Sequence, residues 1–186
     1  MRKLIILIVL LFTVWGIHGQ TRYYTKNGKI FFTATSSLEK IEATNEKATS
    51  VIDVSTGGIE FAVLIKAFNF EKALMQEHFN ENYAESDKYP KAIFKGNITN
   101  IKSIDLNKNG NYPVTAKGLF TLHGETKEIL VDGVLTVKDG NITDGKSQFK
   151  ILLKDYKIEI PSLVKDKISK DVQINVDLNY LLYKPS

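Results

Sequence analysis

The chain has 186 residues and a formal net charge of +4, and it contains no cysteine. This length fits one domain that follows a leader, and the lack of cysteine excludes disulfides and a cysteine-linked lipid anchor. Lysine and glutamate are mixed along the chain without an arginine-rich stripe, which argues against nucleic-acid binding.

The first nineteen residues have the layout of a secretory signal peptide. Arg2 and Lys3 give a short positive region, an almost wholly apolar run covers residues 4–15, and small residues precede Gln20. The run is shorter than the about 20 residues of a spanning helix, and an uncleaved N-terminal anchor is the alternative. We expect residues 1–19 to be removed on export to the periplasm or the medium, leaving a domain at 20–186 without a stable membrane span.

Alternating apolar residues predict strands in the first half of this domain. One strand is expected over residues 29–35 and another over residues 48–54. Residues 55–58, Ser-Thr-Gly-Gly, predict a tight hairpin turn into a third strand over residues 59–68. The pairing of the second and third strands is therefore the most direct local expectation.

The alternation stops in residues 71–82. Phe70, Leu74, His78 and Phe79 recur near helical spacing, with charged and amide residues between them. This spacing predicts a short helix of two or three turns.

Strand patterns return in the second half of the chain. Turn-forming residues predict reversals at 86–90, 107–111, 123–125 and 138–141. The segment 156–170 is irregular, with a helical turn expected at 163–168. Alternation predicts strands over residues 92–98, 114–122, 129–137, 149–153 and 172–180.

About eight strands with one apolar face each predict an all-β, antiparallel meander, which closes as a barrel or packs as a sandwich. Gly96, Gly118 and Gly133 lie inside strand patterns. Glycines at such positions often mark the bends that let a sheet curl closed.

Few residues offer chemistry. The predicted mature domain has two histidines, His78 and His123, whereas a metal site needs three or four ligands. No nucleophile elbow, phosphate loop or zinc-protease motif is present. We expect no metal, no cofactor and no catalysis. For His123 a structural hydrogen bond beside Gly124 and a polar contact at a barrel mouth are both open, and for His78 packing and a mouth contact are both open.

The apolar face is the remaining candidate. An eight-stranded barrel is just wide enough to be filled by side chains or to hold one small ligand. Large residues such as Phe61 and Phe149 favour a barrel interior that is filled by side chains. Small residues such as Ala116 favour a channel through the interior. Both alternatives stay open on the residues alone.

Two sequence motifs resemble those of a known family. The first motif contains, in this order, His78-Phe79, Tyr89-Pro90 and Phe94. The second motif is Leu119-Phe120-Thr121-Leu122-His123-Gly124-Glu125-Thr126-Lys127. At this spacing they resemble the YceI-like family of bacterial lipid-binding proteins. Residues 31–43 depart from the opening His-Ser strand of many members, which indicates a divergent branch.

The resemblance implies an antiparallel eight-stranded lipocalin-like barrel with a short helical insertion. It also implies a periplasmic, non-enzymatic protein whose partner is an apolar lipid such as a polyisoprenoid. A filled barrel that serves as a structural or interaction module and an enzyme acting on a lipid are the alternatives. A homodimer stays open, because edges left by incomplete barrel closure could pair.

Alternation parity selects the side chains that we expect to bind this ligand. His78 and His123 are expected as polar groups at the mouth. The expected apolar lining consists of Phe32, Ile52, Phe61, Val63, Phe94, Val114, Phe120, Val131 and Ile174.

Overall fold

The computed structural model describes residues 21–35, 40–160 and 170–184. The predicted leader and the helical turn predicted at residues 163–168 lie outside the described residues. The helical segments are η1 (Ile65–Ala67), α1 (Ala73–His78), η2 (Phe79–Tyr83), η3 (Ile101–Ser103) and η4 (Leu153–Tyr156). The strands are β1 (Arg22–Thr35), β2 (Lys40–Asp53), β3 (Gly58–Leu64), β4 (Asn69–Phe70), β5 (Lys91–Ile98), β6 (Gly110–Leu122), β7 (Glu125–Lys138), β8 (Asn141–Leu152), β9 (Asp171–Asn179) and β10 (Leu181–Leu182).

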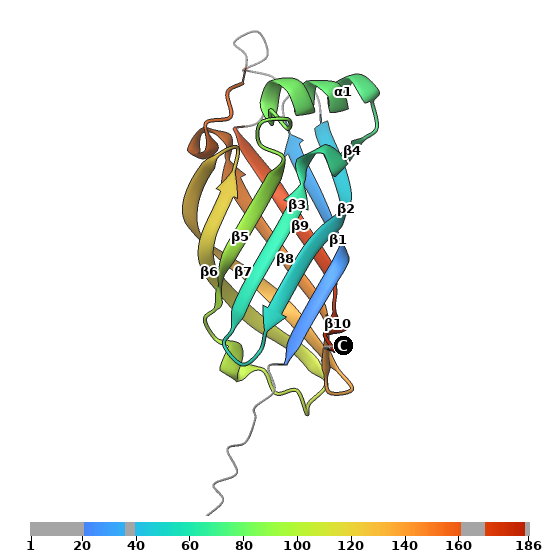
Figure 1. The fold of residues 1–186 in the computed structure, drawn as a ribbon, viewed down its shortest axis with the longest axis vertical. Coiled ribbons are helices and arrows are strands. Elements are labelled where there is room, and N and C mark those ends of the chain that lie inside the picture. Colours follow the sequence, from blue (N-terminus) through green and yellow to red (C-terminus); the bar gives the residue numbers. More distant parts are fainter. Residues whose placement is uncertain (1–20, 36–39, 161–169, 185–186) are drawn as a thin grey trace, which may run out of the picture.

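The strands close into an antiparallel barrel. β1 pairs with β9 on one side and with β2 on the other, which joins the two ends of the sheet. The closed ring is β1-β2-β3-β5-β6-β7-β8-β9, while β4 and β10 are short additions to β2 and β1 (Figure 1). The predicted eight-stranded barrel with a helical insertion is thus confirmed.

Three predicted strands begin well before the expected residue. β1 begins at Arg22 and not at residue 29, β2 begins at Lys40 and not at residue 48, and β8 begins at Asn141 and not at residue 149. The β1–β2 register shifts on both sides of Gly28. Such bulges interrupt the alternation of apolar and polar residues, so the sequence pattern hides the continuous strand.

The predicted helix lies at the upper end of the barrel in Figure 1. α1 covers only Ala73–His78, and the chain continues through Tyr83 as one wider turn, η2. The predicted third strand ends at Leu64, because η1 turns the chain toward this helix. None of the helices in the described residues is long and apolar enough to cross a membrane.

Two mid-strand glycines allow a close approach of β5 and β6. Gly96 pairs with Gly118, and a Cβ atom on Gly118 would come within 2.5 Å of the Gly96 Cα atom. Such a distance leaves no room for a side chain at either position. The two residues therefore permit the tight curvature of the barrel, as the sequence predicts.

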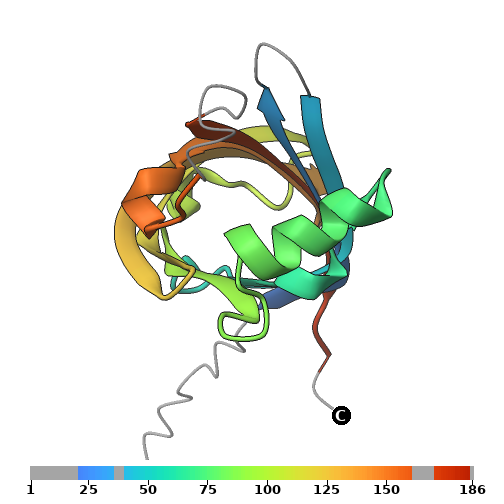
Figure 2. The ribbon, with the colours of Figure 1, turned by 90° about the horizontal axis from the view of Figure 1, so that it is seen from above.

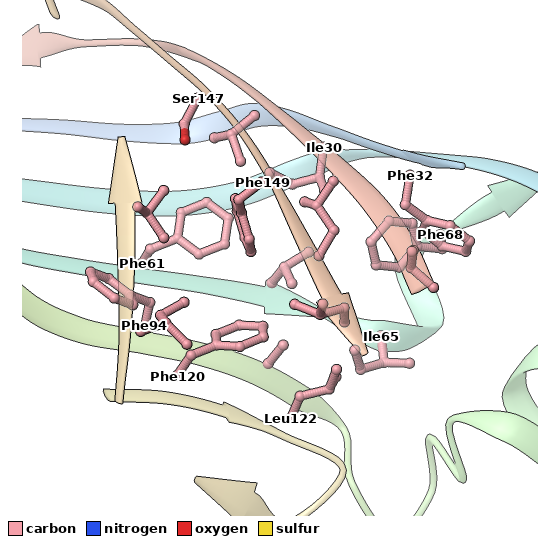
Figure 3. A pocket seen from close by; sticks show the side chains of 18 of the residues that line it. Ile30, Phe32, Phe61, Ile65, Phe68, Phe94, Phe120, Leu122, Ser147 and Phe149 are labelled. Carbon is pink, nitrogen blue, oxygen red and sulfur yellow. The ribbon is translucent and has the colours of Figure 1, made fainter. Parts of the chain in front are cut away.

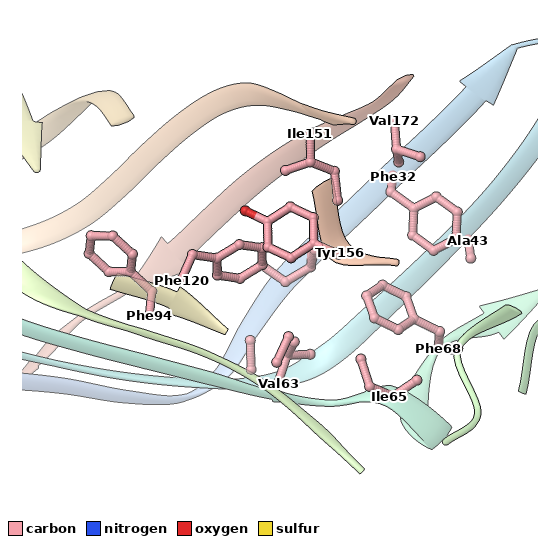
Figure 4. Packing of buried hydrophobic residues seen from close by; sticks show 14 of the residues in the cluster. Phe32, Ala43, Val63, Ile65, Phe68, Phe94, Phe120, Ile151, Tyr156 and Val172 are labelled. Carbon is pink, nitrogen blue, oxygen red and sulfur yellow. The ribbon is translucent and has the colours of Figure 1, made fainter. Parts of the chain in front are cut away.

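The interior divides into two apolar clusters. Figure 4 shows part of the upper one, where Phe32 lies beside Phe68, and Phe120 lies beside Tyr156. The lower cluster fills the other end of the barrel. Its buried members are Tyr23, Ile52, Ile98, Ile101, Val114, Leu135, Val137, Ile142, Leu178 and Tyr180.

Candidate functional site: an apolar cavity in the barrel

A cavity of about 590 Å³ lies inside the barrel. Figure 3 shows Phe61, Phe94, Phe120 and Phe149, which come from four different strands, around the same space. All eight barrel strands contribute inward side chains, and nearly all of these are apolar. Pockets that bind small molecules commonly have volumes of about 300–1,000 Å³.

A buried hydrogen bond marks the floor of the cavity. The Ser50 hydroxyl donates to the carbonyl of Glu60 at 3.0 Å, so the Tyr180 hydroxyl donates to the Ser50 oxygen at 2.9 Å. Burial raises the pKa of Tyr180, which keeps its ring neutral. The lower cluster packs at this end of the barrel, and its members Ile98, Val114, Leu135, Leu178 and Tyr180 also line the cavity.

The upper end is partly covered by α1, which Figure 2 shows lying across the barrel opening. Phe79 follows α1 and anchors it to an aromatic cluster. Its ring centroid lies 5.6 Å from that of Phe32, 5.9 Å from Phe68 and 5.0 Å from Phe70. The cover thus rests on aromatic packing, because no residue of α1 itself is fully buried.

The polar groups of the cavity concentrate at this mouth. Lys72 and His78 line it from the helix, and Tyr83 lines it from the following turn. Burial raises the pKa of Tyr83, so its hydroxyl stays neutral. Farther inside, the Ser147 hydroxyl donates to the Asp132 carbonyl at 2.7 Å. The mouth can therefore hold a polar head, whereas the interior suits a chain of carbon atoms.

The structure brings most of the predicted residues together. Ile52 and His123 lie outside the cavity wall. Whether the other residues contact a ligand stays a prediction. The predicted residues that line the cavity are Phe32, Phe61, Val63, Phe94, Val114, Phe120, Val131 and Ile174, with His78 at the mouth.

The placement of Ile52 in the lining is a correction. Its side chain points inward, as its parity predicts, but it is fully buried in the lower cluster. It pairs with Tyr23 and Ile59 near the lower end of the barrel. The alternation of a strand tells which face a side chain points to, but it does not tell how far along the barrel axis the residue lies. Alternation alone therefore could not exclude Ile52 from the cavity lining.

His123 joins three loops outside the cavity and does not form part of its mouth. Its Nδ1 donates to the Tyr156 carbonyl at 3.0 Å, and its Nε2 lies 2.7 Å from Glu85 Oε2. The Tyr89 ring packs on the imidazole, with 4.4 Å between the ring centroids. The positive φ angles of His123 and Gly124 suit a two-residue hairpin turn. This is the structural hydrogen-bonding role that the sequence left open.

Sequence reasoning missed several lining residues. Ile30, Val176 and Tyr180 carry the same inward parity as the chosen residues of their strands, so alternation was a sufficient signal for them. Phe149, which the sequence places in the barrel interior, also lines the cavity. Met75 had no such signal, because a helix turns this side chain toward the cavity only when it docks on the barrel.

Across residues 21–35, 40–160 and 170–184, histidine, cysteine, aspartate and glutamate form no group of three that could hold a metal ion. Apart from Ser147 and Lys146 and the polar groups at the mouth, the side chains of the wall are aliphatic or aromatic, and they contribute apolar contact and shape. The chemistry of this site is thus burial of an apolar surface.

Comparisons with known proteins agree with this geometry. Residues 18–180 match the family model described as the YceI-like domain. A comparison with functionally characterised proteins gives no significant match.

Solved structures with this fold come from several bacteria. One is a polyisoprenoid binding domain from Saccharophagus degradans, with 15% identity, a TM-score of 0.75, and 89% of this chain and 100% of that chain covered. Burkholderia cenocepacia BcnA has 13% identity and a TM-score of 0.65, with 83% and 96% covered. The Campylobacter jejuni YCEI protein has 17% identity and a TM-score of 0.59, with 80% and 88% covered. At such identities the likeness shows the fold.

Proposed function

Because the chain belongs to the YceI-like family, we propose that it is an exported lipid-binding protein that holds a polyisoprenoid or another long-chain amphiphile inside the barrel. The observation that carries the proposal is the apolar cavity of about 590 Å³. Empty apolar cavities forfeit van der Waals contacts and stay dry, and they take up apolar molecules of suitable size. A hydrocarbon chain satisfies this wall, whereas a polar metabolite would lose its hydrogen bonds with water.

The energetics of burial support this ligand class. Each buried methylene contributes about 0.8 kcal/mol, so ten of them contribute up to ~8 kcal/mol before the entropic cost of binding. No polar contact inside the cavity is needed for such an affinity. The specificity of binding then comes from the length and shape of the ligand's hydrocarbon chain.

The distribution of polar groups favours an amphiphile over a pure hydrocarbon. Lys72 and His78 lie at the mouth beside α1, while Tyr180 closes the opposite end with its hydroxyl turned to Ser50. A polar head would stay at the mouth, and the chain would extend toward the floor. A polyisoprenoid is the specific candidate because the neighbour from Saccharophagus degradans is described as binding one.

The alternatives have less support. A filled barrel that acts as an interaction module would need an interior without a cavity of this size. An enzyme acting on a lipid would need convergent acid, base or metal groups in the cavity, whereas the inner wall is almost wholly apolar and its polar groups lie mainly at the mouth. Export is proposed from residues 1–19, whose sequence has the pattern of a signal peptide.

The proposal can be tested by filling the cavity. Val63 lies on β3, faces inward and lines the cavity, whereas the next residue, Leu64, faces outward. Val63→Trp should occupy part of the space, and Leu64→Trp places the same side chain on the surface as a matched control. Circular dichroism of both variants checks that the barrel still forms.

Native mass spectrometry of protein purified from its own host provides the measurement. The wild type and Leu64→Trp should carry one apolar molecule per chain, which solvent extraction identifies, and Val63→Trp should carry much less. A bare protein mass for the wild type, persisting after incubation with prenyl and fatty-acyl lipids, would contradict the proposal and favour the interaction module.

A further inference from the structure

The β7–β8 ladder ends partway up the barrel wall. It runs from Lys138 and Asn141 up to the pair Gly133 and Ser147, and both strands continue beyond this pair. Paired strands lie about 4.8 Å apart and leave no passage between them, whereas strands without a ladder are free to separate. Just above the pair, the Ser147 hydroxyl donates to the Asp132 carbonyl at 2.7 Å. Within the described residues, backbone pairing between β7 and β8 therefore stops at this height.

The cavity reaches through the wall at the same place. Val134 and Lys146 face outward, as their exposure shows, yet both line the cavity. Conversely, Gly133, Ser147 and Val176 face inward, and they also line a hollow on the outer face of the barrel. Figure 3 shows Ser147 among the side chains around the cavity. We call the point where these five residues meet the side port.

The hollow outside the side port is a trough that crosses four strands. Its two sides are rows of outward residues that lie opposite one another in the ladders, and the row between them faces inward and lines the cavity. The first outward row consists of Lys29, Asp177, Lys146 and Val134. The second consists of Phe31, Asn175 and Gln148. The inward row consists of Ile30, Val176, Ser147 and Gly133. The outer trough thus leads from the side port across β8 and β9 to β1.

Polar side chains of the outer trough bond to protein partners. Lys146 Nζ lies 3.3 Å from Asp177 Oδ2, and Gln148 Nε2 donates to Asn175 Oδ1 at 2.8 Å. The other pairs are Lys29 with Glu46 at 3.3 Å and Asp132 with Thr115 at 2.7 Å.

The groups that the outer trough leaves for a ligand are apolar. Two lysines and two aspartates line it, so their charges balance and favour no ion. The remaining surface comes from Phe31, Val134 and Val176, together with the hydrocarbon stems of the lysines. This surface suits a hydrocarbon chain, as the cavity wall does.

Above the side port, η4 contacts both β7 and β8 and ties the upper part of the split. The Leu153 amide donates to the Lys170 carbonyl at 3.0 Å, and His123 donates to the Tyr156 carbonyl at 3.0 Å. The buried Tyr156 ring lies 5.5 Å from that of Phe120. The place where inside and outside meet is therefore the lower end of the split, at the side port.

From this arrangement we propose that the side port lets the far end of a long apolar chain leave the cavity and lie in the outer trough. The inference rests on the proposed function, because it requires a chain in the cavity. With its head at the mouth, the chain runs toward the floor at Tyr180, and the side port offers the remainder of a longer chain an apolar surface outside. The volume of the cavity then does not set the longest chain that the protein binds.

Cysteine footprinting can locate the chain end, because the natural chain has no cysteine. Val134→Cys places a thiol at the side port, and Leu74→Cys places one on α1 at the mouth. Leu130→Cys is the matched control, since Leu130 faces outward on β7 and lines neither space. The probes are farnesol, a short prenyl alcohol, and solanesol, a long one. The rate of alkylation by iodoacetamide is measured in delipidated protein and with each prenol, and native mass spectrometry counts the bound prenol.

We expect solanesol to slow alkylation at residue 134 severalfold more than farnesol does, and neither prenol to affect residue 130. Bound solanesol with an unchanged rate at residue 134 would overturn the side port and leave the proposed function intact. Extra protection by solanesol at residue 74 instead would also overturn it, because the excess chain would then leave by the mouth. Binding of neither prenol would contradict the proposed function, and the side port with it.

A substitution at the side port tests the same route without a thiol. Val134→Trp should cover the port from outside, and the ratio of bound solanesol to bound farnesol should fall by about tenfold, as when about two methylenes lose their contacts. Leu130→Trp places the same ring elsewhere on the outer face of β7 and should keep the wild-type ratio. Circular dichroism checks that both variants fold. An unchanged ratio in folded Val134→Trp would show that long chains do not use the side port.

Discussion

The hydroxyl of Tyr180 sets the lower limit of the cavity. It is buried, and its acceptor is the Ser50 oxygen, whose own proton goes to the Glu60 carbonyl. A buried hydroxyl without an acceptor is costly, so this chain of bonds holds the ring in place. An apolar chain in the cavity therefore meets a fixed floor at Tyr180.

The direction of these bonds predicts unequal effects of two substitutions. Tyr180→Phe removes a donor and leaves Ser50 bonded to Glu60, so we expect a loss of about 1 kcal/mol in the free energy of unfolding. Ser50→Ala leaves the buried Tyr180 hydroxyl without an acceptor. The free energy of unfolding should then fall by more, about 1–3 kcal/mol. Urea unfolding followed by circular dichroism measures both values. A larger loss for Tyr180→Phe would contradict the assigned direction.

Asp53 gives stability a pH dependence at the β2–β3 turn. Hydrogen bonds from Ser55, and next from Arg22, lower the pKa of this carboxyl group. Its contribution is therefore fully present above the ordinary aspartate pKa and is lost as the pH falls through the lowered folded-state pKa.

Asp53→Asn should test this linkage. Near neutral pH we expect the variant to be about 1 kcal/mol less stable, because the amide cannot replace the charged bonds to Arg22 and Ser55. The difference should shrink as the pH falls through the lowered pKa. Urea titrations at several pH values measure it, and a difference that stays constant down to acid pH would argue against a charge effect.

At the scale of elements, α1 is the least secured part of the barrel. Lys72, the residue before the helix, makes no capping side-chain bond, and none of the residues of α1 is buried. Its attachment depends on Phe79, whose ring contacts Phe32, Phe68 and Phe70. Gln76 Oε1 adds a hydrogen bond that it accepts from the Phe70 amide at 3.2 Å. An element held by one aromatic cluster and few hydrogen bonds opens more readily than the strands below it.

Phe79→Ala should therefore release α1 without unfolding the barrel. Removing a half-buried ring costs about 1–2 kcal/mol, which corresponds to roughly tenfold faster amide exchange by local opening. Hydrogen exchange with mass spectrometry should show this change in the peptides that cover α1 and η2. Equal acceleration in β5 and β6 would mean that Phe79 supports the whole barrel instead.

The sequence predicted those elements whose physical signal is local. Alternation located β5, β6, β7 and β9, and helical spacing located α1, since each pattern follows from the residues of one segment. The early part of β1 was missed because its bulges at Gly28 break the period of two.

The sequence also predicted only part of the candidate site. Parity selects inward side chains, so it found Phe61 and Phe120, but it also selected Ile52, which belongs to the filled lower end. The end of the β7–β8 ladder at Gly133 and Ser147 had no sequence signal, since the strand patterns of both strands continue past this point. Height along the barrel and splits between strands are properties of the tertiary structure.

At the scale of the whole molecule, the barrel combines a filled end with a hollow end. The lower cluster supplies a packed core, whereas the upper half leaves about 590 Å³ without protein atoms. Stability in the hollow half then depends on what occupies it, because an apolar wall gains contacts from a bound chain. The lipid would act as part of the core.

If the cavity holds the proposed lipid, removal of that lipid should lower the stability of the entire domain. A ligand that binds only the folded state adds about 2.7 kcal/mol at a hundredfold excess over its Kd, which raises Tm by roughly 5–10 °C in a domain of this size. Differential scanning calorimetry of protein before and after delipidation measures the shift, and adding back the extracted lipid should restore it. Val63→Trp should melt at one temperature with or without lipid, because the ring occupies the space of the chain. If delipidation left the Tm of the wild type unchanged, the occupant would lie outside the barrel.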